Sequence, residues 1–409
     1  MRIYIKILYI KHTSYTIILK FLNTILLNQW VITVTIKEGL EDVIACKSSI
    51  SRIEIEDEKA ILEYRGYNIH DLAKFSCYEE VAYLLLFGEL PSKSELEAFT
   101  EELKDLRELP PQIIGLLTHL PPFTHPMVVL RTAISYLGSI DKYIHYKSRE
   151  HSIEKAKSLI AKLPTIVAYY HRIRTGQNLV HPNDDLGHAA NFLYMLHGKE
   201  PSELEARCMD VDFILHADHE LNASTFAARI AASTMADMYA CIVAATGTLM
   251  GPLHGGAAQK VIEMFREIAV PWRAEEYVKE KLRRKERIMG FGHRVYKNAM
   301  DPRTIELKAL AKMLAEEKDS KWFEIAEAVE RAVYKYKKLL PNVDFYSACI
   351  YATLGIPDDL FIPIFAIGRI AGWVAHIIEQ YENNRLIRPR AQYVGPKSRK
   401  YIPIDQRSK

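Results

Sequence analysis

An alanine-rich stretch from Ala223 to Met250 predicts one long helix that is apolar on almost every side. Such a helix has to be covered by other helices or by a second subunit, and alanine lets neighbouring helices approach closely. Arg229 and Asp237 lie inside the stretch and argue against a membrane span, because charges are costly in a bilayer core. The stretch therefore predicts the central helix of a helical core or of a subunit interface.

The rest of the chain supports a mainly α-helical fold. Strand and helix patterns do not alternate along it, which argues against a parallel sheet. Ser92 with Glu95, and Ser202 with Glu205, have the spacing of capping boxes that begin helices. One short β-hairpin is expected over residues 52–64, where partly alternating runs flank a charged turn.

The charge pattern divides the chain into domains. With 409 residues the chain is long enough for two. Strongly charged, amphipathic helices after the alanine-rich stretch predict a smaller helical domain, residues 257–344, between two segments of a larger one, residues 37–256 and 345–409. The last segment includes a basic C-terminal arm. Residues 1–36 are expected to be an N-terminal extension, too short in its uncharged part for a membrane span and without a signal-peptide cleavage site.

Composition narrows the classes of function. A hydrophobic share of 49% and a charged share of 26% are typical of a soluble globular protein, and a net charge of +3 gives no indication of a nucleic-acid partner. The five cysteines are scattered without C-x-x-C spacing, which argues against disulfides and cysteine-ligated zinc. We therefore expect a cytoplasmic protein without stable membrane association.

The alanine-rich helix has to end at the sequence GPLHGG, residues 251–256. His254 then lies at a sharp break, directly before a helix that begins near Ala257. The positive end of that helix disfavours a second positive charge, so a neutral imidazole is expected there, able to donate a hydrogen bond to an oxygen that gains negative charge. The alternative is an ordinary helix–helix turn whose histidine satisfies a backbone carbonyl group.

Two further histidine-containing segments allow more than one interpretation. In HADHE, residues 216–220, the histidines and carboxylates could ligate a metal, could cap two helices, or could place His219 in an anion site at the next helix N-terminus. In GFGHRVY, residues 290–296, His293 lies in a glycine-containing loop that follows a basic helix end. Such a basic run is either a solvated face or a site for the phosphates of a nucleotide-like ligand.

Helix starts place further charged residues. Asp301 is expected to cap a helix in which Arg303 reaches an anion at that terminus. Asp344 falls in the first turn of a helix capped by Asn342, where it serves as a general base or only stabilises the helix. Arg369 is a lone charge in an apolar run and needs an anionic partner. Together these groups suit removal of a proton next to a carbonyl, with arginines holding a carboxylate-rich second substrate.

These motifs, in this order and approximate spacing, resemble those of the citrate synthase family, in particular its shorter, dimeric members. The resemblance covers about residues 37–407. Its motifs are DHE at residues 218–220, GPLHGGA at 251–257, GFGHRVY at 290–296, DPR at 301–303, NVD at 342–344, GRIAGW at 368–373 and RPR at 388–390.

The resemblance implies a citrate-synthase-like fold, mainly α, with a large and a small helical domain, and a homodimer with its active site between the domains. It implies an acyltransferase that converts the acyl group into alkyl on transfer, condensing acetyl-CoA with oxaloacetate in the tricarboxylic acid cycle. No metal and no cofactor are implied, with acetyl-CoA as substrate. The implied catalytic residues are His254, His293 and Asp344. The implied oxaloacetate-binding residues are His219, Arg303, Arg369 and, from the partner subunit, Arg388. The implied CoA-binding residues are Arg287, Ile288, Gly290 and Lys297.

Two other functions fit the same residues. A 2-methylcitrate synthase would use propionyl-CoA, and one methylene separates two substrates by only about 1 to 3 kcal/mol. A non-catalytic helical dimer would keep the fold for binding alone, although a scaffold has no need for His254, His293 and Asp344 together. The shorter family members lack a counterpart of residues 1–36.

Overall fold

The computed structural model describes residues 37–40, 43–57, 59–297 and 299–407. The expected N-terminal extension, residues 1–36, lies outside the described residues. The chain divides into two compact units, residues 1–47 and residues 48–409. In the first unit the described residues contain one short 3-10 helix, η1 (Glu38–Leu40).

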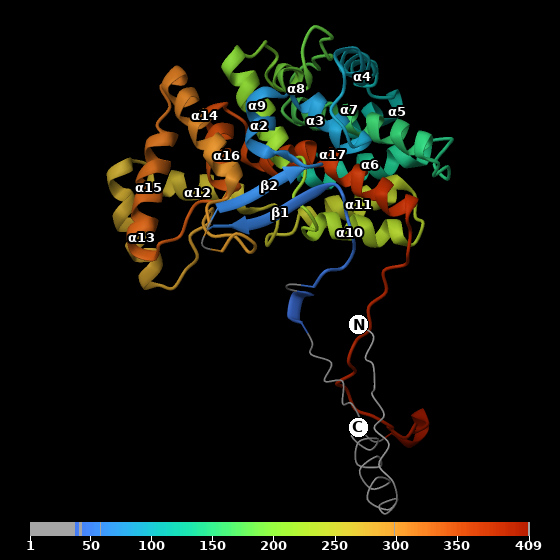
Figure 1. Ribbon diagram of the computed structural model, residues 1–409. Helices are drawn as coiled ribbons and strands as arrows, with labels where there is room; N and C mark the ends of the chain where they lie inside the picture. Colours follow the sequence, from blue (N-terminus) through green and yellow to red (C-terminus); the bar gives the residue numbers. More distant parts are fainter. Residues whose placement is uncertain (1–36, 41–42, 58, 298, 408–409) are drawn as a thin grey trace, which may run out of the picture. The chain divides into compact units, whose positions relative to one another are not determined.

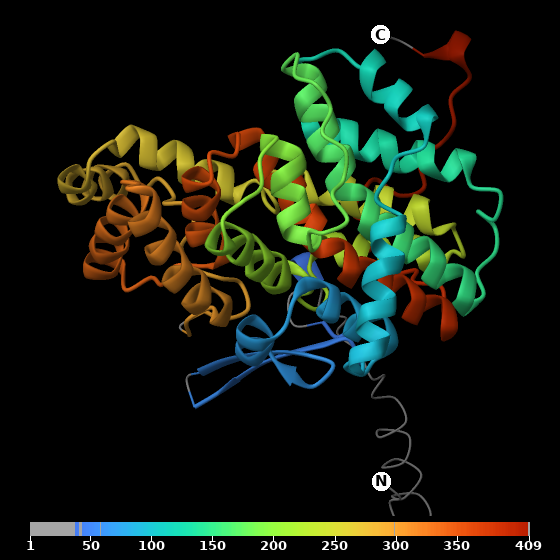
Figure 2. The ribbon, with the colours of Figure 1, turned by 90° about the horizontal axis from the view of Figure 1, so that it is seen from above.

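The second unit is mainly α-helical, as predicted, and Figure 1 and Figure 2 show a small sheet on one side of its helices. Its α-helices are α2 (Ile69–Phe75), α3 (Tyr78–Phe87), α4 (Lys93–Asp105), α5 (Pro111–His119), α6 (Pro126–Ile140), α7 (Arg149–Arg174), α8 (His188–His197), α9 (Glu203–His216), α10 (Ala223–Ser233), α11 (Met238–Leu249), α12 (Ala257–Ile268), α13 (Ala274–Arg283), α14 (Pro302–Lys318), α15 (Trp322–Lys337), α16 (Val343–Thr353) and α17 (Phe361–Glu382). Its 3-10 helices are η2 (Pro271–Arg273), η3 (Asp358–Leu360) and η4 (Ile404–Gln406). Both predicted capping boxes are present, at the starts of α4 and α9.

The predicted β-hairpin is confirmed as β1 (Ser51–Glu56) and β2 (Lys59–Tyr64), which pair antiparallel. A short third strand that the pattern did not predict, β3 (Tyr67–Asn68), pairs antiparallel with β2 and completes the order β1-β2-β3. Asn68 then caps α2, because its side chain accepts the backbone N–H of His70 at 2.9 Å. The sheet therefore leads directly into the helical part of the unit.

The prediction of one long helix from Ala223 to Met250 is wrong, because the stretch forms two helices, α10 and α11. Met235 has a positive φ of 61°, and the Asp237 side chain accepts the backbone N–H of Ala240 at 2.9 Å to begin α11. A side-chain cap and one left-handed residue outweigh the helix propensity of the alanines. The two helices pack against each other and against α17, so the expected core location holds for both.

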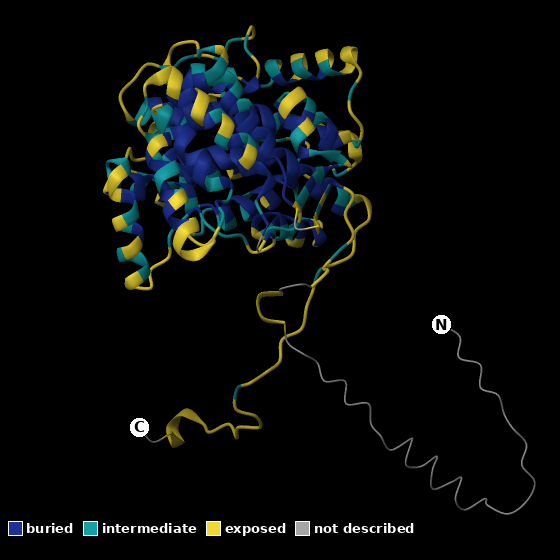
Figure 3. Cartoon of the chain, turned by 60° about the vertical axis from the view of Figure 1, so that its left-hand side comes forward, coloured by how far each residue is buried: buried dark blue, intermediate teal, exposed yellow. Residues whose placement is uncertain are grey.

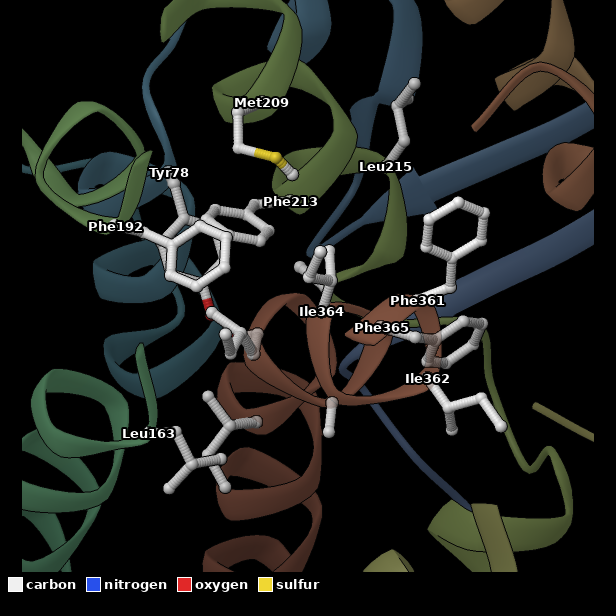
Figure 4. Close-up of a cluster of buried hydrophobic side chains, with 14 of the residues drawn as sticks. Tyr78, Leu163, Phe192, Met209, Phe213, Leu215, Phe361, Ile362, Ile364 and Phe365 are labelled. Carbon is white, nitrogen blue, oxygen red and sulfur yellow. The ribbon is translucent and has the colours of Figure 1, made fainter. Parts of the chain in front are cut away.

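The core of the unit is built around α17, whose residues are almost all buried. Its neighbours include α3, α7, α9, α10 and α11. By length and composition α17 could cross a membrane, but all of its apolar window is buried inside the protein. Figure 4 shows part of this core, with side chains from α3, α7, α8, α9 and α17 in one cluster. Figure 3 shows buried residues throughout the helical part, whereas the segment after α17 is almost wholly exposed.

The helices α12 to α16 pack largely on one another and lie together in both Figure 1 and Figure 2. Two of them also reach the remaining helices, since α14 packs against α9 and α12 packs against α17. Helix α16 is also linked to α9, because Ser347 and Tyr351 donate hydrogen bonds to Asp212. The domain boundaries at residues 257 and 344 remain a prediction.

Two glycines of α17 allow a close approach to the end of α9. A Cβ atom on Gly372 would lie 2.2 Å from the carbonyl oxygen of Ala217, and one on Gly368 would lie 3.0 Å from the Cβ of His216. The backbone N–H of Gly372 also donates to that Ala217 carbonyl at 3.1 Å. Only glycine at position 372 leaves room for this contact between two backbones.

Replacing this glycine should destabilise the fold. We expect Gly372→Ala to lower the free energy of unfolding by about 1 to 3 kcal/mol or more, because the new methyl group overlaps the Ala217 oxygen. Gly115→Ala in α5 is the matched control, since a Cβ there has no heavy atom within 4 Å. It should raise stability by about 0.4 to 1 kcal/mol. Urea denaturation at one protein concentration measures the free energy of unfolding of both variants. Equal stabilities of the two variants would contradict the packing argument.

Candidate active site

His254 lies in the loop between α11 and α12, where the sequence predicts a break. The loop turns back sharply, because the N–H of Gly255 donates to the carbonyl of Leu249 at 3.0 Å and a Cβ on Gly255 would lie 2.5 Å from that oxygen. Ser224, at the start of α10, holds the ring: its Oγ lies 2.9 Å from Nε2 of His254. The imidazole is thus fixed between the first turn of α10 and the loop.

The pKa of His254 is lowered to about 4, first by burial and then by the positive charge of Arg369. The ring is therefore neutral at pH 7, as the sequence predicts. The physical cause differs from the one expected, because burial and a nearby guanidinium have the largest effects.

His293 and His219 lie next to each other, with ring centroids 5.1 Å apart. Nδ1 of His293 accepts the backbone N–H groups of Val295, at 3.1 Å, and of Tyr296, at 3.4 Å. Because a backbone N–H can only donate, a neutral His293 carries its proton on Nε2. Burial, followed by the charge of Arg303, lowers the pKa of His293 to about 4, so the neutral form prevails at pH 7.

His219 is buried, and its Nε2 lies 2.8 Å from the hydroxyl oxygen of Tyr296. Burial and the charge of Arg303 lower the pKa of His219 well below its usual value. The Tyr296 ring also packs on His293, with centroids 4.5 Å apart. One tyrosine therefore fixes the positions of two histidines that are far apart in the sequence.

Arg303 begins α14 as predicted, with Asp301 as the cap and Pro302 between them. The guanidinium pairs with the Asp301 carboxylate through two hydrogen bonds, Nε to Oδ1 at 2.9 Å and Nη2 to Oδ2 at 2.8 Å. The backbone N–H of Val343 donates to the same carboxylate at 3.2 Å, which ties the start of α16 to the start of α14. Arg303 is buried and keeps its positive charge, because Asp301 raises its pKa.

Asp344 lies in the first turn of α16, and the Asn342 side chain caps this helix by accepting the N–H of Asp344 at 3.2 Å. Burial raises the pKa of Asp344 to about 6, although His216 and Arg303 act in the opposite direction. The carboxylate is therefore ionised at pH 7, but it is more basic than an exposed one. A general base benefits from that basicity.

Arg369 is buried on α17, and its Nε donates to the carbonyl of His216 at 2.5 Å. The guanidinium lies 4.8 Å over the ring of Phe365. Its Nη1 is buried and has no hydrogen-bond partner among the described residues. Burial lowers the pKa of Arg369 to about 10, which leaves it charged at pH 7. A buried cationic donor without a partner is the arrangement that an anionic ligand would complete.

Six of the predicted site residues are brought together: His219, His254, His293, Arg303, Asp344 and Arg369. Their electrostatic effects connect them, because Arg303 acts on the pKa of His219, His293 and Asp344, and Arg369 acts on that of His219 and His254.

The other predicted site residues are placed differently. Arg388 lies exposed in the segment after α17, and its contribution to a partner's site remains a prediction. Arg287 and Lys297 are exposed on either side of the GFGHRVY loop, with Ile288 half-buried. Gly290 is buried with a positive φ of 82°, and a Cβ there would lie 2.7 Å from the Phe345 ring. Gly290 thus packs against α16, the helix that carries Asp344.

The two histidines of the HADHE segment bind protein groups. His216 Nδ1 lies 2.8 Å from the carbonyl oxygen of Asp212, and His219 is bound to Tyr296. Within the described part of the chain, no group of three or more His, Cys, Asp or Glu side chains is arranged to hold a metal ion.

Two residues of the site, Ser224 and Asp212, carried no signal that sequence reasoning used, and Tyr296 entered it only as part of the GFGHRVY motif, without a role of its own. Each acts on a partner through a tertiary contact, 30 residues away for Ser224 with His254 and 77 for Tyr296 with His219. No local pattern identifies such contacts.

The fold and the site together define a class: a mainly α-helical enzyme in which neutral histidines, an aspartate with a raised pKa and buried guanidinium groups lie in one region. The family model "Citrate synthase, C-terminal domain" matches residues 39–390. The chain therefore belongs to the citrate synthase family, as the sequence motifs predict.

Relatives and solved structures agree with this assignment. The chain is 49% identical to citrate synthase 2 of Bacillus subtilis, and the match covers 91% of the chain and 100% of that protein. It is 42% identical to 2-methylcitrate synthase of Shewanella oneidensis, and this match covers 90% of the chain and 97% of that protein. It is similar to citrate synthase of Thermotoga maritima, with 43% identity, a TM-score of 0.82 and coverage of 92% and 100%. A ternary complex of carboxymethyl coenzyme A and oxaloacetate with citrate synthase from Thermoplasma acidophilum gives 34% identity, a TM-score of 0.85 and coverage of 91% and 100%.

The raised pKa of Asp344 predicts a cost in stability. In the folded state the carboxyl has a pKa of about 6, against an ordinary value of 3.8. Stability therefore falls as the pH rises from about 4 to 6, and above pH 6 the full cost is present, on the order of 3 kcal/mol. We expect Asp344→Asn to raise the free energy of unfolding by about 1 to 3 kcal/mol at pH 7.5 and by almost nothing below pH 4.

Denaturant titrations at the two pH values measure this difference. Asp185→Asn serves as control, since Asp185 is exposed in a loop and its loss should change stability by less than about 0.5 kcal/mol. A destabilised Asp344→Asn protein at pH 7.5 would show that the carboxylate is stabilised rather than strained by its surroundings.

Proposed function

We propose that the protein condenses acetyl-CoA with oxaloacetate and water to give citrate and CoA, the first step of the tricarboxylic acid cycle. The observation that carries this proposal is the meeting of the Asp344 carboxylate with neutral histidines and with Arg369, a buried guanidinium that lacks a partner on Nη1. Removing a weakly acidic methyl proton needs a base beside a hydrogen-bond donor for the enolate oxygen. The two carboxylates of oxaloacetate need cationic hydrogen-bond donors.

Asp344 would take the methyl proton of acetyl-CoA. Its pKa of about 6 leaves it ionised at neutral pH yet more basic than an ordinary aspartate, which favours proton transfer from carbon. His254 would donate a hydrogen bond to the thioester oxygen as that oxygen becomes the enolate. Ser224 already holds Nε2 of its ring, so the other nitrogen would face the acyl group.

His293 would protonate oxaloacetate as the new bond forms. The enolate carbon attacks the ketone carbon of oxaloacetate, and the ketone oxygen takes up a proton. A neutral His293 carries that proton on Nε2, because Nδ1 accepts two backbone N–H groups. Water then hydrolyses the citryl thioester and releases citrate and CoA.

The carboxylates of oxaloacetate would bind to His219, Arg303, Arg369 and a partner subunit's copy of Arg388. The free Nη1 of Arg369 supports this, as does the burial of Arg303. The exposed position of Arg388 after α17 fits a residue that completes the site of a second copy in a homodimer.

CoA would bind along residues 287–297, through Arg287, Ile288, Gly290 and Lys297. The two exposed cations suit its phosphates, and the backbone at Gly290 allows close approach. Residues 257–344 would act as the smaller domain that closes over both substrates and excludes water before condensation. All of these steps would use side chains of the protein, without a metal or redox cofactor. We also place the enzyme in the cytoplasm.

A second candidate activity is 2-methylcitrate synthesis from propionyl-CoA, because a 2-methylcitrate synthase of Shewanella oneidensis is 42% identical to the chain. We expect thiol release from acetyl-CoA plus oxaloacetate, with propionyl-CoA used less efficiently by up to about 200-fold, since a pocket discriminates by only about 1 to 3 kcal/mol between substrates that differ by one methylene. A thiol-trapping assay with each acyl-CoA measures both values of kcat/KM. A higher value with propionyl-CoA would favour the second activity, and no thiol release with either would favour a non-catalytic dimer.

Asp344→Asn should lower kcat by about 100-fold to 10,000-fold, because the amide cannot accept the methyl proton. Binding of oxaloacetate, followed by calorimetry, should stay close to that of the unchanged protein and serves as the control for an intact site. The unchanged protein should lose kcat/KM about tenfold per pH unit below about pH 6, as Asp344 becomes protonated. A near-normal rate of Asp344→Asn would remove Asp344 from the role of base.

A further inference from the structure

Asp212 is a fully buried carboxylate on α9, one helical turn before His216. Its Oδ1 accepts the hydroxyl of Ser347 at 2.6 Å, and its Oδ2 accepts the hydroxyl of Tyr351. Nothing in the proposed reaction uses this group. A buried carboxylate is costly unless its oxygens are satisfied, and here two hydroxyl donors from one helix satisfy it.

Both donors come from the helix that carries Asp344. Ser347 and Tyr351 follow Asp344 by three and seven residues in α16, a spacing that places all three on one face of a helix. Asp212 therefore holds the face of α16 whose first residue is Asp344. The position of the Asp344 carboxylate relative to α9 depends on these two hydrogen bonds.

His216 forms a second connection between Asp212 and the site. Its Nδ1 lies 2.8 Å from the Asp212 carbonyl oxygen and 3.3 Å from Oδ2 of the same residue. A carbonyl oxygen can only accept, so Nδ1 carries a proton. The carbonyl of His216 in turn accepts the Nε of Arg369 from α17. Helices α9, α16 and α17 thus meet at Asp212 and His216.

Charged and titratable groups from three helices face Asp344. They are Asp212 and His216 from α9, Asp301 and Arg303 from the start of α14, and Arg369 from α17. Asp212 and Asp301 raise the pKa of Asp344, whereas His216 and Arg303 lower it. Both aspartates also bind α16: Asp301 accepts the backbone N–H of its first residue, Val343, and Asp212 accepts two side-chain hydroxyls further along the helix.

We propose that Asp212 is a positioning residue for the base of the reaction: by accepting the hydroxyls of Ser347 and Tyr351 it holds the Asp344 face of α16 against α9. The negative charge of Asp212 also acts on the Asp344 carboxylate from this position. This inference rests on the proposed function, in which Asp344 removes the methyl proton. Asp212 does not touch either substrate and acts through Asp344.

Asp212→Asn tests the charge, because asparagine keeps the shape and one oxygen acceptor. We expect the acidic limb of the kcat/KM profile to move to lower pH by about half a unit to one unit, since loss of a nearby negative charge lowers the pKa of Asp344. We also expect kcat at pH 8 to fall by about tenfold to a hundredfold, because the base is less well positioned. An acidic limb at its original pH would overturn the proposal.

Two variants separate position from charge. Ser347→Ala removes one hydrogen bond but keeps the Asp212 carboxylate, so kcat should fall while the acidic limb stays in place. Asp210→Asn is the matched control: Asp210 is also a carboxylate on α9, half-buried, but it accepts the N–H of Tyr78 and pairs with Arg207, away from α16. Asp210→Asn should leave the limb unchanged. An equal shift in Asp210→Asn and Asp212→Asn would mean a general loss of structure and would contradict the proposal.

A readout without turnover separates this inference from the proposed function. Carbon-13 NMR of the aspartate carboxyl groups, with the Asp344 signal assigned by its loss in Asp344→Asn, follows the titration of Asp344 directly. We expect the Asp344 titration to move to lower pH in Asp212→Asn and not in Asp210→Asn. If the unchanged protein releases no thiol, the proposed function fails while this titration still supports or overturns the effect of Asp212 on Asp344.

Discussion

The contact between the end of α9 and the middle of α17 is the interaction on which the site depends. Two backbones meet there, because Gly372 leaves room for its N–H to reach the carbonyl of Ala217. One helical turn earlier, Arg369 donates to the carbonyl of His216. The same contact therefore places Arg369 and, just beyond the end of α9, His219 in one region. A larger side chain at position 372 would separate the two helices and with them the groups that bind anions.

Burial sets the chemical character of the side chains at this place. It keeps His254 and His293 neutral at pH 7, and it makes Asp344 a stronger base than an exposed aspartate. The same burial leaves Nη1 of Arg369 without a partner among the described residues. Each of these features costs folding free energy, and the large apolar core around α17 outweighs that cost. Such a cost in stability is typical of sites selected for function rather than for stability.

Local signals in the sequence predicted much of the secondary structure and of the site. Asp301 and Asn342 are recognisable as helix caps, and both place a functional side chain within the first turn of a helix. The hairpin near the start of the globular part was also predictable, because alternation and a charged turn are local features. The break between α10 and α11 was missed, since one left-handed residue and one capping aspartate inside an alanine-rich stretch give a weaker signal than the alanines do.

By itself the sequence determined the mainly α-helical class, the helix starts, the break at His254 and, through seven motifs, the family. Only the tertiary structure decided which residues hold those groups in place: Ser224 on His254, Tyr296 on His219 and His293, and Asp212 on the helix of Asp344. The reason is physical. Caps and breaks depend on residues within one helical turn, whereas the position and pKa of a buried group depend on neighbours that the fold brings from distant parts of the chain.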